Sequence, residues 1–219
     1  MSRALIVGAS GMIGNIVLKQ CLEDSRIEQV VSMTRRTLGF EHNKLQEHIH
    51  ENFIDFTGKE HLFEKVDYAF FCIGVYTGQV PDDQFKMITV DMAVAFADSL
   101  KNHSPSATLC FLSGQGADLT EKSRMSFARY KGMAENYLLN KDFKSLFIFR
   151  PAYIYPVETR KEPNVTYSIL RFLYPILNKI YSKGAIRSDA LGKAMFTAAL
   201  TGAPKTILEN EDIKAILTL

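Results

Sequence analysis

Short runs of apolar, β-favouring residues alternate along the chain with longer stretches in which apolar residues recur three and four positions apart. The short runs are typical of strands and the longer stretches of helices. Most of the runs are apolar without interruption, which indicates strands that are covered on both faces. The pattern therefore predicts the α/β class, a doubly wound parallel sheet between two layers of helices.

The periodicity places the individual elements as follows. Strands are predicted at Ala4–Val7, Gln29–Met33, Asn52–Ile54, Tyr68–Ile73, Thr108–Leu112, Leu146–Phe149 and Thr206–Leu208. Helices are predicted at Ile13–Leu22, Glu60–Lys65, Asp82–Lys101, Ser123–Leu139 and Leu191–Thr201.

A chain of 219 residues with 47% hydrophobic content is long enough for one sizeable core, so we expect a single domain over residues 1–219. After Pro151 the alternation of strand and helix is lost and prolines recur at positions 156, 163 and 175. We expect residues 152–187 to form a cover on the substrate side, because ligands of open α/β sheets bind beyond the carboxyl ends of the strands. A core helix with an apolar face toward a dimer partner or a lipid is an equal alternative.

The first predicted strand runs directly into a glycine-rich turn, LIVGASGMIG. Gly8 allows a tight turn, Gly11 lets a diphosphate approach the backbone, and Gly14 lets the helix pack close to the strand. The diphosphate then lies at the N-terminus of the helix, where the dipole favours negative charge. Strand, glycine triplet, helix and second strand follow in the order that a dinucleotide site requires, and Ser10, Met12 and Ile13 complete this predicted site.

The second predicted strand ends in VVSMTRR, where an NAD site would carry an acidic residue for the ribose. Arg35 and Arg36 stand there instead, and a guanidinium offers charge-assisted hydrogen bonds to a 2′-phosphate. NADP is therefore the predicted cofactor, with NAD the less favoured alternative.

Later motifs resemble those of the extended and atypical short-chain dehydrogenase/reductases, a superfamily of NAD(P)-binding, Rossmann-like proteins that includes NAD-dependent epimerases and dehydratases. FFCIG, FLSGQGAD and FRPAYIYP are similar to its fourth-strand, fifth-strand and Arg-Pro motifs, and the arginine-ended strand and Lys-Gly-x-x-Glu pattern are similar to the Tat-interacting-protein-like oxidoreductases. The resemblance implies cofactor contacts from residues after the third, fourth, fifth and sixth strands and from the following helix. These residues are Asp55, Phe56, Cys72, Ile73, Gly74, Ser113, Lys131, Pro151, Ala152 and Tyr153.

One departure from the family pattern concerns the catalytic tyrosine. In the superfamily a serine and Tyr-x-x-x-Lys carry the chemistry, and the resemblance gives Ser113 and Lys131 these roles, with Lys131 clamping the ribose. Phe127 stands four residues before Lys131, on the same face of the helix, and a phenyl ring carries no proton. Tyr130 is a candidate substitute, although a surface tyrosine with its hydroxyl in water is the more favoured interpretation.

Composition excludes several other classes of function. The formal net charge is +2 without a run of like charges, which gives no indication of nucleic-acid binding. The three cysteines lack the paired spacing of a disulfide framework or a metal site, which indicates a reducing compartment. No apolar run is long enough to span a bilayer. We therefore expect a cytoplasmic protein. The five histidines do not have the spacing of a metal site, and Glu135 has an ordinary ion-pair explanation.

The sequence therefore predicts an NADP-dependent oxidoreductase acting on a small molecule. Because Phe127 replaces the tyrosine, we expect a reductase of an electron-poor acceptor, for which solvent can supply the proton. A catalytically silent NAD(P)-binding regulator or redox sensor is the first alternative, and a nucleotide-sugar epimerase or dehydratase is the second. The proteins that this chain resembles include monomers and homodimers.

Overall fold

The computed structural model describes residues 2–76, 78–158 and 184–218. Its main sheet has seven strands in the order β3-β2-β1-β4-β5-β6-β9, and all neighbours are parallel. The strands are β1 (Arg3–Val7), β2 (Gln29–Thr34), β3 (Leu45–Ile49), β4 (Tyr68–Phe71), β5 (Thr108–Leu112), β6 (Ser145–Arg150) and β9 (Ile207–Glu209). The predicted doubly wound, Rossmann-like α/β sheet is confirmed.

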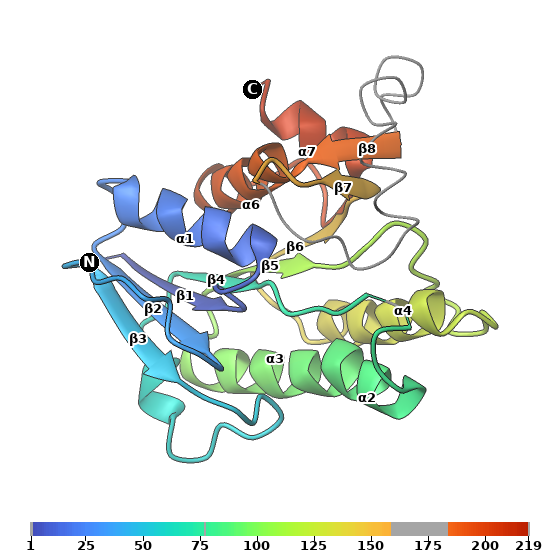
Figure 1. Cartoon of the computed structure of the whole chain (residues 1–219), viewed down its shortest axis with the longest axis horizontal. Helices are drawn as coiled ribbons and strands as arrows, with labels where there is room; N and C mark the ends of the chain where they lie inside the picture. Colours follow the sequence, from blue (N-terminus) through green and yellow to red (C-terminus); the bar gives the residue numbers. More distant parts are fainter. Residues whose placement is uncertain (1, 77, 159–183, 219) are drawn as a thin grey trace.

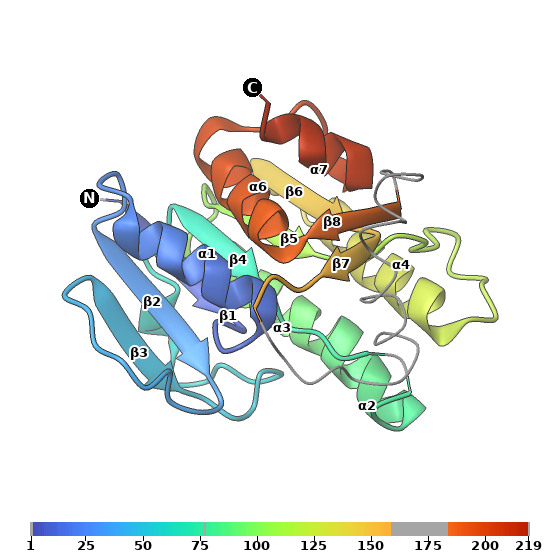
Figure 2. The same cartoon turned by 45° about the horizontal axis from the view of Figure 1, so that its top comes forward.

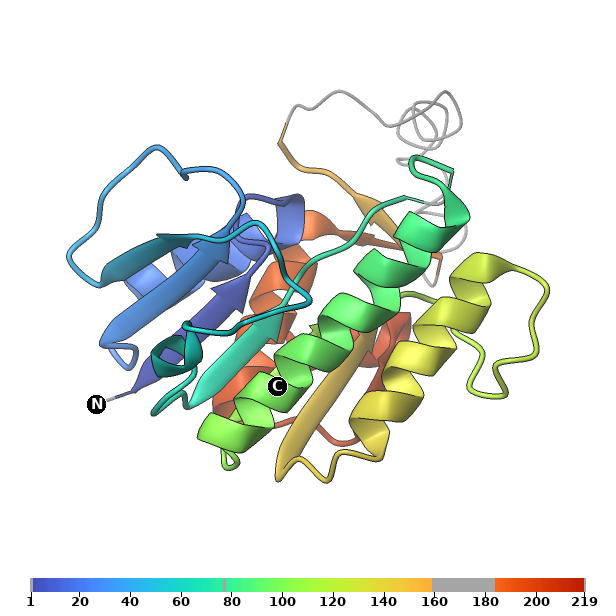
Figure 3. The same ribbon diagram turned by 90° about the horizontal axis from the view of Figure 1, so that it is seen from below.

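Helices cover both faces of this sheet (Figure 1). One face carries α1 (Met12–Glu23) and α6 (Ser188–Thr201), with α7 (Asn210–Ile216) packed against α6. The other face carries α3 (Met92–His103) and α4 (Ser126–Leu139), which lie side by side in Figure 3. Two shorter segments lead into α3, namely α2 (Asp82–Lys86) and a π-helical turn, η2 (Met87–Asp91), and a 3₁₀ turn, η1 (Glu60–Leu62), precedes β4.

Alternation of side chains along the buried strands divides the core into two halves. In β1, Ala4 and Ile6 pack toward α1 and α6, whereas Leu5 and Val7 pack toward α3 and α4. All four are fully buried. This two-sided burial explains why the strand is apolar at every position rather than at alternate positions.

Several predictions of secondary structure need correction: α6 begins at Ser188 and not at Leu191, and the helix expected at Glu60–Lys65 is only the 3₁₀ turn η1. Asn52–Ile54 is not a strand, and the third strand is Leu45–Ile49 at the edge of the sheet. The edge position leaves Gln46 and Ile49 exposed, so the strand lacks the continuous apolar run of its neighbours. The helix expected from Ser123 begins at Ser126.

A second, two-stranded sheet pairs β7 (Tyr153–Tyr155) with β8 (Ala185–Arg187) in parallel register. Neither strand was expected, because each is only three residues long. Figure 2 shows this pair beside α6. The two strands belong to the expected cover at 152–187, and the rest of that cover, with Pro163 and Pro175, lies outside the described residues. Among the helices of the described part, none has the length and apolar character to cross a membrane.

Candidate functional site

A cleft opens at the carboxyl ends of β1, β4 and β5, where the strand order reverses on the two sides of β1. It has a larger cavity of about 540 Å³ and a smaller one of about 120 Å³. Both cavities are lined by Gly11, Cys72, Ile73, Gly74 and Val75, so they are compartments of one cleft. This position is where ligands bind in open α/β sheets.

The three glycines of the turn after β1 differ in why a larger residue would not fit at their positions. Gly8 has φ +83°, and a Cβ there would lie 2.8 Å from the backbone carbonyl of Cys72. A Cβ on Gly14 would lie 2.2 Å from the carbonyl oxygen of Gly8. Both glycines are therefore required by the packing of the chain itself.

Gly11 is different, because a Cβ there would meet only the Gly8 carbonyl oxygen, at 3.2 Å. Gly11 is the N-cap of α1 and lines both cavities. The first turn of α1 carries no acidic residue, so the positive end of the helix dipole faces the cleft without a competing charge. The cradle fits an anionic diphosphate that approaches the bare backbone.

The smaller cavity extends from this turn toward the end of β2. Ser10, Arg35 and Phe53 line it, and the side chain of Arg35 is exposed. Arg36 is also exposed but lies outside the linings of both cavities. The geometry thus separates the two arginines, and only Arg35 borders the compartment in which an adenosine phosphate would lie.

Asp55 and Phe56 lie outside the described linings as well. The Asp55 carboxylate accepts hydrogen bonds from the amide and hydroxyl of Thr57, at 2.9 and 2.6 Å, and these bonds lower its pKa. Phe56 is buried against Phe53 and Phe63. The aromatic residue at the smaller cavity is therefore Phe53, two to three positions before the predicted contacts.

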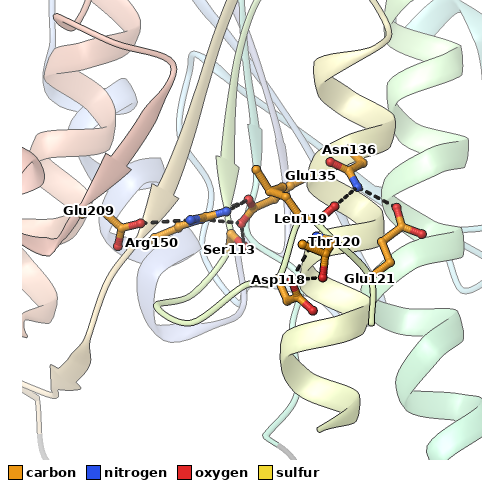
Figure 4. Close-up of polar contacts among 9 residues, drawn as sticks. All are labelled: Ser113, Asp118, Leu119, Thr120, Glu121, Glu135, Asn136, Arg150 and Glu209. Carbon is orange, nitrogen blue, oxygen red and sulfur yellow. Dashed lines mark hydrogen bonds and ion pairs between the residues drawn. The ribbon is translucent and has the colours of Figure 1, made fainter. Parts of the chain in front are cut away.

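A largely buried polar network joins α4, β5 and β6 (Figure 4), and its member Ser113 also lines the larger cavity. The Glu135 carboxylate on α4 is fully buried and accepts a hydrogen bond from the Ser113 hydroxyl at the end of β5. Arg150 Nε lies 3.0 Å from each Glu135 oxygen, and Arg150 Nη1 lies 3.0 Å from Glu209 Oε1. The expected ion pair of Glu135 is confirmed, and its burial makes it a structural tie between α4, β5 and β6.

Lys131 lies one turn before Glu135 on the same face of α4 and lines the larger cavity. Its Nζ donates to the carbonyl oxygen of Leu112 at 3.4 Å. Burial lowers the pKa of Lys131 to about 8, and the Glu135 carboxylate acts in the opposite direction. The Lys131 side chain is therefore mostly protonated at pH 7 and loses its proton near pH 8.

Phe127 lines the larger cavity one turn before Lys131, at the position expected for the missing phenol. Tyr130 does not share that lining. Its ring is buried near Phe85, and its hydroxyl donates to Asp82 Oδ2 at 2.6 Å. The interpretation of Tyr130 as a surface residue with a solvated hydroxyl is therefore wrong, and its place away from the cavity also speaks against a catalytic role.

Most of the predicted cofactor and catalytic residues meet at the two cavities. These residues are Gly8, Ser10, Gly11, Met12, Ile13, Arg35, Cys72, Ile73, Gly74, Ser113, Lys131, Pro151, Ala152 and Tyr153. Burial raises the pKa of Cys72 to about 12, so this thiol is part of the wall and not a thiolate nucleophile. No group of His, Cys, Asp and Glu in the described part of the chain is arranged to hold a metal ion.

Several lining residues were not predicted from the sequence. Ile88 and Met92 reach the smaller cavity from the π-helical turn and the start of α3, and Leu112, Gly114 and Ile154 line the larger one. Their apolar side chains carry no motif, and the offset introduced by the π turn is not visible in the helical periodicity. Leu112 and Gly114, inside FLSGQGAD, and Ile154, inside FRPAYIYP, stood beside recognised positions.

The parallel sheet with this strand order, the glycine turn before α1 and the cleft at the carboxyl ends of the strands define a Rossmann-like α/β protein. Comparison with known proteins agrees with this assignment. Protein HTATIP2 of Rattus norvegicus is 28% identical over 149 residues, which cover 67% of this chain and 60% of that protein. The match thus spans well under two thirds of the relative's own length. No protein-family model matches the chain.

Solved structures share the fold. The Bordetella bronchiseptica enzyme WbmF, in complex with NAD+ and UDP, superposes with a TM-score of 0.71 at 14% identity, covering 98% of this chain and 75% of WbmF. A short chain dehydrogenase family protein from Francisella tularensis superposes with a TM-score of 0.68 at 12% identity, covering 92% of each chain. At these identities the comparison shows a common architecture.

Proposed function

We propose that this chain is an NADP-dependent oxidoreductase of the atypical short-chain type, which reduces an electron-poor small molecule in the cytoplasm. The observation that carries the proposal is Gly11, because packing explains Gly8 and Gly14, whereas Gly11 borders both cavities at the N-terminus of α1. The NAD+ complex of WbmF, a protein of the same fold, supports a dinucleotide as the occupant of this cleft.

Each residue has a defined task in this proposal. The α1 N-terminus and Gly11 bind the diphosphate, and Arg35 binds the 2′-phosphate of NADP through charge-assisted hydrogen bonds. Lys131 holds the nicotinamide ribose at the larger cavity, as the family resemblance implies. We also propose cofactor contacts from Arg36, Asp55 and Phe56. These contacts require the adenosine to extend beyond the residues that line the two cavities.

The bound nicotinamide would supply a hydride, and the chain provides position and exclusion of water. Phe127, Leu112 and Ile154 give the larger cavity an apolar wall. With Phe127 in place of a phenol and Tyr130 bonded to Asp82, the described cavity offers no tyrosine at the expected catalytic position. Such a site favours acceptors whose reduced form takes its proton from water.

A catalytically silent NADP-binding regulator is the second candidate, and the same observation at Phe127 favours it. The two functions separate in one assay, in which the protein is mixed with NADPH and a panel of flavins, quinones and aldehydes while nicotinamide absorbance is followed. Turnover on one member of the panel supports the reductase. Tight NADPH binding without turnover on any member contradicts it and supports the regulator.

The nucleotide-sugar alternative receives less support. The polar side chains that line the larger cavity in the described residues are Ser113, Lys131, Tyr76 and Tyr153, which is a sparse set for a polyhydroxylated sugar. A small, apolar acceptor fits this lining better.

A further inference from the structure

Gly114 and Phe127 are neighbours in the lining of the larger cavity. A Cβ on Gly114 would lie 2.7 Å from Cζ of Phe127 and 3.5 and 3.7 Å from the two adjacent ring carbons. Cζ is the para carbon, which carries the hydroxyl in tyrosine. A side chain at position 114 would therefore point at the place of the phenol oxygen of a tyrosine at position 127.

The backbone around Gly114 is held on both sides. The Ser113 N–H donates to the Phe149 carbonyl oxygen at 2.8 Å, and the Gln115 N–H donates to the Pro151 carbonyl oxygen at 2.9 Å. The direction in which position 114 presents a side chain is thus set by the end of β6. Gly114 cannot retreat from the ring without loss of these bonds.

The ring of Phe127 is held as well. It packs with a small apolar cluster formed by α2, η2 and α4, which includes Phe85, Val90 and Tyr130. The Tyr130–Asp82 hydrogen bond ties α4 to α2 beside this cluster. The absence of a side chain at position 114 is therefore what gives the ring its place.

Ser113 does not supply a proton to the larger cavity either. Its hydroxyl proton is used in the hydrogen bond to Glu135, and a hydroxyl has only one proton to donate. Toward the cavity Ser113 can then act only as an acceptor, so it cannot polarise a substrate carbonyl.

From these contacts, and on the basis of the proposed reductase function, we infer that Gly114 and Phe127 are a matched specificity-determining pair that restricts the acceptor to the quinone class. The pair is an apolar contact, and neither residue carries a proton that it could deliver. An acceptor whose reacting oxygen lies at this contact must therefore be reduced without an acid from position 113, 114 or 127.

A quinone meets this requirement. One NADPH gives a hydride, which carries two electrons, and the quinone with one proton from water becomes the hydroquinone while the nicotinamide is oxidised. The intermediate is a phenolate, with a basicity near that of tyrosine at pKa about 10, so water can protonate it afterwards. An aldehyde would instead form a far more basic alkoxide and needs the acid during transfer. Phe127, which lines the cavity, also offers a flat quinone an aromatic contact.

The contact itself is tested by thermal unfolding. Gly114→Ala is expected to lower Tm in the wild-type background, because its Cβ meets the ring, and to leave Tm nearly unchanged in a Phe127→Ala background. Gly74→Ala is the matched control, since nothing lies within 4 Å of its Cβ, and its effect should be the same in both backgrounds. An equal effect of Gly114→Ala in both backgrounds overturns the pairing.

The acceptor class is tested with menadione and benzaldehyde as probes and NADPH as donor. We expect the wild type to reduce menadione but not benzaldehyde, and Phe127→Tyr, whose hydroxyl takes the space that Gly114 leaves free, to gain benzaldehyde turnover by at least about tenfold over the wild type. Benzaldehyde reduction by the wild type, or no gain in Phe127→Tyr, overturns the inference. NADPH titration of each protein separates the two proposals: without binding the proposed function fails, whereas binding without menadione turnover overturns only the quinone assignment.

Discussion

Replacement of Glu135 by glutamine would test the buried network that supports the catalytic side of the cleft. Glu135 is fully buried, and its partner Arg150 has a side chain that is 12% exposed. Glutamine keeps the shape of the side chain but leaves the guanidinium with a single carboxylate partner, Glu209, which is 44% exposed. Loss of one partner of a buried pair costs about 3–5 kcal/mol, and we expect about 3 kcal/mol here.

The assay is urea unfolding of Glu135→Gln followed by circular dichroism, together with a thermal melt. For a chain of this size, that loss corresponds to a fall in Tm of about 6–12 °C. Lys19→Met is the matched control, because Lys19 and Glu158 form an ion pair of 3.5 Å between side chains that are 52% and 80% exposed. Such a pair contributes about 0.5 kcal/mol or less. Equal small losses in both variants would refute the reasoning.

The same substitution has a consequence for Lys131. Burial lowers the pKa of Lys131 to about 8, and the charge of Glu135 opposes that fall. Removal of the charge should move the pKa of Lys131 lower still, so any step that needs the ammonium should lose rate at a lower pH than in the wild type. An unchanged pH profile of NADPH binding and turnover would contradict the coupling.

Three further predictions concern the cofactor side and Lys131. Gly11→Ala should fold normally but lose NADPH affinity by about tenfold or more. Gly14→Ala should instead lose about 3 kcal/mol of stability, because its Cβ would lie 2.2 Å from a carbonyl oxygen. Equal melting temperatures and equal NADPH affinities of the two variants would contradict this distinction. Arg35→Ala should weaken NADPH binding about tenfold and leave NADH binding unchanged, while Arg36→Ala should weaken NADPH binding by a smaller factor, as measured by fluorescence titration. The pKa of Lys131 is lower in the folded protein than in the unfolded chain, so its burial destabilises the fold fully below about pH 8 and less as the pH rises toward 10.5. Lys131→Met should therefore stabilise the protein more at pH 7 than at pH 10. A gain in stability that is independent of pH would contradict this prediction.

The buried strands could be predicted from the sequence because two-sided burial demands apolar residues at every position. The third strand could not, because Leu45–Ile49 forms the edge of the sheet and includes polar residues. The strand predicted at Asn52–Ile54 contains the apolar residue Phe53, which lies in a loop and packs against the core. Strands β7 and β8 were missed since three residues are too few to show a period.

The phosphate turn was predictable for a different reason, since the spacing of glycines reports directly on backbone geometry. The environment of Ser113 was not predictable, because its partner Glu135 lies 22 positions away and becomes a partner only through burial against Arg150. Tyr130 likewise finds Asp82 across 48 positions. Sequence spacing fixes the face of a helix on which a residue lies, but the partner on the opposite element is set by tertiary packing.

We propose that the N-terminus of α1 and Arg35 together bind NADP. Isothermal titration calorimetry of the wild-type protein with NADPH and with NADH tests it most directly. We expect saturable heat with both nucleotides and tighter binding of NADPH. No heat with either nucleotide would contradict the site, and tighter binding of NADH would contradict the role of Arg35.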